Sequence, residues 1–201
     1  MKNTIKLLTI LATLLLFSGC TSKTLPSTQK YTLEITNNYN SNIKTQAFDI
    51  KILEPSTSKL FNNTYIYYSE KAFTIHPYAL NKWSDYPTKM IEKQIALKLD
   101  QAKLYRSTST SMVNGKYDYI LQAELLTMVQ IIEAEQSKSV LSIKFYILDK
   151  YNKNIASKTF NYAVKNNHTN AYEAVKSYNK ALNLLLGDLF DWLSTTTAKQ
   201  K

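Results

Sequence analysis

The chain of 201 residues contains very little cysteine and histidine. Its single cysteine, Cys20, cannot form a disulfide within the chain, and zinc fingers and thiol redox pairs need further cysteines that are absent. The two histidines, His76 and His168, have no histidine or carboxylate neighbour at the spacing of a metal-ligand set. We therefore expect no metal site and no cofactor, and a fold that is stabilised by packing alone.

Glycine is also scarce, and its three occurrences, Gly19, Gly115 and Gly187, stand far apart. A phosphate-binding loop needs glycines clustered between a strand and a helix, and the nucleophile elbow of hydrolases needs two glycines around a serine. The paired carboxylates Asp188 and Asp191 lie one helical turn apart and fit a solvated face better than a catalytic one. We predict that the protein binds no nucleotide and is not an enzyme.

The first twenty residues form the most informative segment of the chain. Lys2 and Lys6 precede an apolar run over residues 7–17, which at roughly 11 residues is too short to span a membrane. Small residues then lead directly to Cys20. This pattern resembles the lipobox of bacterial lipoproteins, which implies that residues 1–19 are a removed signal peptide and that Cys20 carries acyl chains such as palmitate. An uncleaved anchor or a buried helix is the alternative.

Removal of the 19-residue signal from 201 residues leaves 182, enough for one domain that buries about 70% of its unfolded surface. Two lysines leave with the signal, which lowers the formal net charge from +10 to +8. A cationic exported domain could favour anionic lipid or an acidic partner. We prefer charge spread over solvated surfaces, because no run of five like charges occurs. Nucleic acid is not an expected partner, since a tethered exported domain has little access to it.

Composition divides the mature chain into three parts. Residues 20–30 comprise the lipidated cysteine and a polar tether that contains Pro26. Residues 31–193 form one folded domain, and residues 194–201 form a polar tail.

Alternation of apolar and polar residues predicts most of the strands. Brief alternation over residues 31–35 and clear alternation over residues 48–52 open the domain. A hairpin follows, with strands at 64–68 and 72–75 joined by a polar turn. Three later runs form a meander in which each strand has one buried face. On the first of these runs the predicted buried face is Tyr119, Leu121, Ala123, Leu125, Thr127, Val129 and Ile131.

Two helices complete the predicted domain. The first begins at Pro87 after the capping side chains of Ser84 and Asp85. The second follows a cap-like pair, Asn170 and Glu173. Its apolar stripe steps by four and three residues through Ala171, Val175, Tyr178, Leu182, Leu185, Leu189 and Trp192. The stripe could be a coiled-coil seam, but packing on the domain's own sheet is favoured.

Gly187 lies inside the last predicted helix, where glycine costs about 1 kcal/mol relative to alanine. We expect close packing at this position to explain it. The predicted fold class is α+β: a single domain with an antiparallel β-sheet, made of a hairpin plus a three-stranded meander, packed by two α-helices.

Tyr65, Tyr67 and Tyr68 occur on both faces of one predicted strand. We expect at least one of these faces to be exposed and available to a partner or a lipid. Ordinary packing within the sheet is the favoured alternative.

The segment around these tyrosines is similar to the central motif of the ABC-type transport auxiliary lipoproteins, the family of the paraquat-inducible protein C type. Trp83 with Pro87 is the most specific part of the resemblance. The matching residues are Tyr67, Tyr68, Ile75, Tyr78, Ala79, Trp83, Pro87, Met90, Ile91 and Leu99.

The resemblance implies a non-enzymatic docking component of a lipid-transport system that maintains envelope integrity. Its partners would be an ABC permease and a mammalian-cell-entry-domain protein, with phospholipid and a second copy of the chain as further candidates. Tyr67, Tyr68, Trp83 and Pro87 would be motif residues and a candidate partner surface. Thr21 after the cysteine favours the outer membrane, facing the periplasm. The alternative is a lipoprotein that regulates or assembles an envelope enzyme or an outer-membrane complex.

Overall fold

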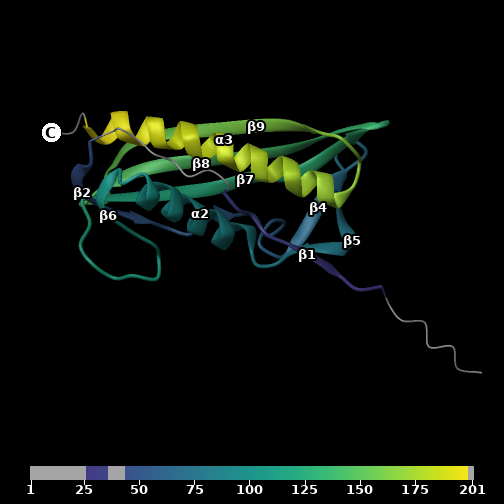
Figure 1. The fold of residues 1–201 in the computed structure, drawn as a ribbon, viewed down its shortest axis with the longest axis horizontal. Coiled ribbons are helices and arrows are strands. Elements are labelled where there is room, and N and C mark those ends of the chain that lie inside the picture. The colour runs from purple at the N-terminus through teal and green to yellow at the C-terminus, as the bar shows by residue number, and fades with distance from the viewer. Residues whose placement is uncertain (1–25, 36–43, 199–201) are drawn as a thin grey trace, which may run out of the picture.

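The computed structural model describes residues 26–35 and 44–198. Within these ranges one sheet and two helices form the fold (Figure 1). The strands are β1 (Gln29–Tyr31), β2 (Gln46–Ile52), β3 (Ser56–Thr57), β4 (Tyr65–Ser69), β5 (His76–Trp83), β6 (Tyr105–Ser109), β7 (Tyr119–Glu133), β8 (Gln136–Asp149) and β9 (Asn154–Asn166). The helices are α2 (Pro87–Gln101) and α3 (Ala171–Ala198), so α3 continues into the segment expected to be a polar tail.

The long strand β7 organises the sheet. One edge of β7 pairs antiparallel with β8, which pairs antiparallel with β9. Along its other edge, β2, β3 and β4 follow one another, and each runs parallel to β7. Beyond these, β6 pairs parallel with β2, β5 pairs antiparallel with β4, and β1 pairs parallel with β5.

The sheet is therefore mixed, and the prediction of an antiparallel sheet is wrong. Parallel neighbours need a crossover connection rather than a tight turn. Helix α2 supplies such a connection, because in the sequence it follows the β4–β5 pair and precedes β6 and β7. The α+β class and the two helices are as predicted.

The predicted hairpin also differs in detail from the structure. Its second strand was expected at residues 72–75, but β5 runs from His76 to Trp83, with His76 opposite Tyr68. Residues 70–75 instead form a loop in which Phe73 has a positive φ of 65°. A strand cannot continue through that backbone conformation.

Both helices cover one side of the sheet (Figure 1). Helix α3 packs on β8 and β9, and α2 packs against β2, β6 and α3. The apolar stripe of α3 is buried as far as Leu189 and partly buried at Trp192, so the prediction that it packs on the domain's own sheet is confirmed. Within the described residues, neither helix is long and apolar enough to span a membrane.

The two helix starts differ from each other. At α3, the Asn170 Oδ1 accepts a 2.9 Å hydrogen bond from the backbone N–H of Glu173, as the cap prediction requires. At α2, Tyr86 occupies the N-cap and no side chain caps the helix. The Asp85 carboxylate accepts the N–H of Tyr86 instead, so the predicted cap is wrong while the start at Pro87 is right.

A β-bulge in β7 changes which side chains face the helices. Leu125 lies opposite Ile143 and Thr127 lies opposite Ser142, which leaves Leu126 as an extra residue. Before the bulge the odd-numbered residues are buried, as predicted. After it, Met128 and Gln130 take the helix-covered side, and Thr127, Val129 and Ile131 move to the other side. The prediction of a single buried face is therefore wrong beyond Leu125, although Val129 is still buried, at 5% exposed, on the side away from the helices.

Candidate functional site

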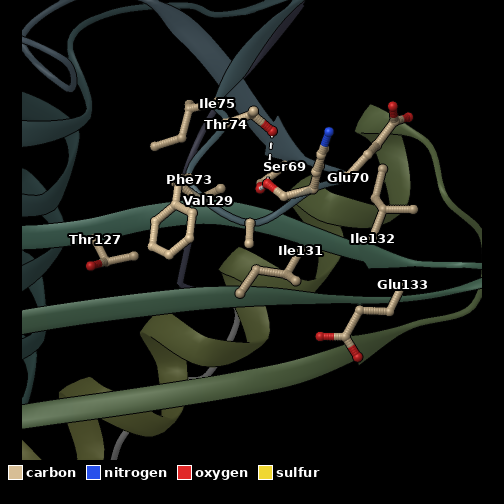
Figure 2. Close-up of a pocket in the computed structure, with 12 residues that line it drawn as sticks. Ser69, Glu70, Phe73, Thr74, Ile75, Thr127, Val129, Ile131, Ile132 and Glu133 are labelled. Carbon is tan, nitrogen blue, oxygen red and sulfur yellow. Dashed lines mark hydrogen bonds between the residues drawn. The ribbon is translucent and has the colours of Figure 1, made fainter.

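A hollow of about 500 Å³ lies on the side of the sheet away from the helices (Figure 2). One wall is the β4–β5 loop, residues 70–75, which contributes Phe73 and Ile75. The floor is the part of β7 after the bulge, which contributes Thr127, Val129 and Ile131. We call this hollow the hairpin groove. Its lining is mainly apolar, because the bulge turns these β7 residues outward.

The loop that forms the wall is held by hydrogen bonds to one backbone carbonyl. The Lys71 carbonyl accepts the Thr74 N–H at 3.1 Å and the Thr74 hydroxyl at 2.7 Å. The Ser69 hydroxyl donates to the same oxygen at 3.1 Å. Phe73 lies inside this turn with its side chain fully exposed, and Ile75 is 42% exposed. The loop therefore presents a large apolar side chain from a fixed backbone.

A buried polar network supports the groove from the helix-covered side. The Tyr78 hydroxyl donates to Gln130 Oε1 at 2.5 Å, and Gln130 Nε2 donates to Ser137 Oγ at 3.0 Å. Asn166 Nδ2 also donates to Ser137 Oγ, and Ser139 Oγ donates to Asn166 Oδ1. Burial raises the pKa of Tyr78 to about 12, so its hydroxyl stays protonated and donates at physiological pH. The network links β5, β7, β8 and β9.

Charged groups at the groove are balanced in sign. Glu70 and Lys71 are adjacent on the loop, and Glu133 at the end of β7 lies 3.4 Å from the Lys138 ammonium. Among the described residues, no group of three or more histidine, cysteine, aspartate or glutamate side chains could hold a metal ion. The geometry of the groove suits apolar groups.

Most residues of the predicted partner surface are in the core. Trp83 is 2% exposed, and its ring centroid is 5.8 Å from that of Tyr178. Tyr67 is 8% exposed and packs edge-on against Phe61, and Pro87 is buried at the start of α2. The structure therefore does not place a partner surface at these three positions, because their side chains are already packed inside the domain.

The remaining predicted residues have different positions. Tyr68 is partly buried, with its ring centroid 4.7 Å from that of Tyr78, while Tyr65 is 41% exposed. The strand thus has one exposed tyrosine, as expected. Cys20 lies outside the described residues.

Phe73 was not predicted as a candidate residue, because residues 72–75 were expected to form a strand. One signal was available, because the alternation there lasts only four residues and directly follows the polar triplet at residues 69–71. A second missed signal marks the bulge, because the alternation of β7 breaks at Leu126, Thr127 and Met128, where the polar residue falls on the predicted apolar face.

The fold and the groove define an α+β domain with an exposed apolar surface. Residues 31–189 match the family described as the ABC-type transport auxiliary lipoprotein component. The chain belongs to this family, and the resemblance seen in the sequence is confirmed. Membership associates the chain with the cell envelope and with an ABC-type transporter.

Two solved structures share the fold at low sequence identity. Protein XCC0632 from Xanthomonas campestris has 14% identity and a TM-score of 0.78, over 85% of this chain and 98% of that one. An uncharacterized protein has 9% identity and a TM-score of 0.66, over 84% of this chain and 99% of that one. No curated protein matches the sequence.

Proposed function

We propose that this chain is a non-enzymatic, lipid-anchored auxiliary subunit of an ABC-type lipid transporter. It docks with a mammalian-cell-entry-domain protein and the permease, is held in the outer membrane facing the periplasm, and contributes to envelope integrity. The family match over residues 31–189 carries this proposal. The lipobox-like sequence that ends at Cys20 supports the anchor.

The physical properties of the domain are compatible with a docking role. Ten residues separate Cys20 from Tyr31, a random-coil span of about 16–19 Å, so the tether keeps the domain near its membrane. Stable anchoring needs more than one acyl chain, and tethering raises the local concentration of the domain for weak partners. The hairpin groove offers apolar surface for contact.

Co-purification tests the proposed partners. The full-length chain, tagged at its C-terminus, is extracted from its native membrane in mild detergent, and its companions are identified by mass spectrometry. We expect the permease and the mammalian-cell-entry-domain protein, and native mass spectrometry of the complex reports bound lipid and subunit number. Recovery of a cell-wall synthase or an outer-membrane barrel without transporter subunits would favour a regulatory or assembly lipoprotein instead.

Fractionation and complementation test the anchor. Deletion of the gene is expected to sensitise the envelope to detergents, and the wild-type chain should restore resistance. Cys20→Ala should fail to complement and should lose its acyl mass. Thr21→Asp should move the protein from the outer to the inner membrane, as the sorting pattern of enteric lipoproteins implies. Acylated protein found only in the inner membrane would refute the outer-membrane assignment.

A further inference from the structure

We propose that the β4–β5 loop, residues 70–75, inserts Phe73 into the surface of the membrane that anchors the chain. The inference rests on the proposed acylation of Cys20 and adds a second, protein-made contact to that anchor. The loop would then fix the orientation of the domain on the membrane, which an acylated tether alone cannot do.

The first observation is the combination of exposure and backbone conformation at Phe73. The side chain is fully exposed, although burying a phenylalanine is strongly favourable in water. Its φ of 65° is uncommon for a bulky residue and costs on the order of 1 kcal/mol. Hydrogen bonds from Ser69 and Thr74 to the Lys71 carbonyl hold the turn in place. An apolar side chain held in water at this cost indicates an apolar environment in the functional state.

The second observation is the position of the tether. The described N-terminal segment and β1 lie at the same end of the molecule's long axis as β4 and β5, and the C-terminus lies at the opposite end (Figure 1). Cys20 precedes Pro26, the first described residue, by six residues, which span at most about 20 Å. An acylated Cys20 therefore holds this end of the domain close to the membrane.

The charged groups near the loop are balanced, so they allow contact with either anionic or zwitterionic lipid. Glu70 is adjacent to Lys71, and Glu133 is paired with Lys138. The formal charges of these four groups cancel, so no electrostatic preference for anionic or zwitterionic headgroups is expected. Ile75, 42% exposed at the end of the same loop, extends the apolar surface next to Phe73. Binding through these side chains should depend weakly on salt.

Tryptophan probes at two exposed positions test the proposal in the anchored protein. Full-length acylated protein is reconstituted into zwitterionic phosphatidylcholine vesicles as Phe73→Trp or as Met112→Trp. Met112 is a matched control, because it is 91% exposed and lies in the β6–β7 loop, before the start of β7. The β4–β5 loop lies beside the other end of β7, where Ser69 pairs with Ile131. The emission of Trp83 and Trp192 is subtracted using wild-type protein.

We expect lipids with brominated acyl chains to quench Phe73→Trp and to leave Met112→Trp unchanged. Equal quenching at both positions, or no quenching at position 73, would overturn the proposal. Failure of the protein to carry acyl chains would overturn the anchor and this inference together. Co-purification with transporter subunits is measured separately, so the loop contact and the proposed function can fail independently.

A second measurement uses the rate at which the acylated protein transfers between vesicles. Loss of one buried phenylalanine should raise the transfer rate of Phe73→Ser at least about tenfold. Met112→Ser should transfer at the wild-type rate. Both side chains are exposed, so neither variant should impair folding. Equal rates for Phe73→Ser and wild type would contradict membrane insertion of the loop.

Discussion

Replacement of Trp83 by alanine separates a core role from a partner-binding role for the motif residue. Trp83 is 2% exposed and packs against Tyr178, which is fully buried. Its backbone pairs with Tyr31 of β1, so the side chain lies where the N-terminal strand, β5 and α3 meet. Truncation of a buried aromatic side chain leaves a cavity and destabilises by about 3–5 kcal/mol. That is a large part of the roughly 5–15 kcal/mol by which a domain is stable.

Urea unfolding followed by circular dichroism measures this loss in the chain from residue 20 with Cys20→Ser. With a slope of about 2 kcal/mol/M, the midpoint of Trp83→Ala should fall by roughly 1.5–2.5 M. The control is Tyr65→Ala, at a neighbouring position that is 41% exposed, which should lose about 1 kcal/mol or less. Trp83→Ala with wild-type stability and lost transporter co-purification would refute the core role.

Three further changes test the packing and the charges of the domain. Gly187→Ala should stabilise by about 1 kcal/mol in urea unfolding, because an added Cβ meets nothing within 4 Å; destabilisation would mean hidden crowding. Tyr178→Phe should be neutral or stabilising by up to about 1 kcal/mol, since the buried hydroxyl makes no hydrogen bond of normal geometry among the described residues, although Ser139 lies near it. A loss above that would show an unseen partner. The hydrogen bond from Arg106 lowers the pKa of Asp49, so Asp49 adds stability above its unfolded pKa that is lost as the pH falls through its folded pKa. Asp49→Asn should therefore be less stable than wild type at pH 7, and the difference should disappear in acid titrations well below pH 3.8. A constant difference would contradict the ion pair.

The absence of close contacts at Gly187 corrects the expectation drawn from the sequence. A glycine inside a helix is explained by crowding only if a neighbour occupies the place of the Cβ, and no described atom does so. Sequence alone cannot tell a required glycine from a tolerated one, because both produce the same local cost.

Helix α3 could be predicted because its information is local. The stripe from Ala171 to Leu189 repeats at helical spacing, and the Asn170 cap marks its start. An amphipathic helix with one apolar face must bury that face against something, and the nearest surface is the sheet that precedes it in the chain. The same helical spacing is present in α2, where Ile91, Ile95 and Leu99 are at most 1% exposed.

The order of the strands could not be predicted in the same way. Alternation identifies a strand and its buried face, but it is the same for a parallel and an antiparallel neighbour. Strand β2 pairs with β7 across a sequence separation of about seventy residues, as the pair Ile50 and Tyr119 shows. Such pairings are set by the packing of the whole domain rather than by local turns.

The hairpin groove shows why a candidate functional surface is harder to predict than the core. The alternation in β7 breaks at Leu126, Thr127 and Met128, but a strand of constant register would still bury all its odd-numbered residues. The extra residue Leu126 inverts that assignment, so that Gln130 enters the core and joins the network of Tyr78 and Ser137. Val129, which is 5% exposed, and Ile131, which is partly buried, then lie on the side away from the helices and line the groove with Phe73. A single inserted residue thus creates both the polar support of the groove and its apolar floor. The two features depend on each other, since a β7 without the bulge would bury neither Gln130 nor its partners in this arrangement.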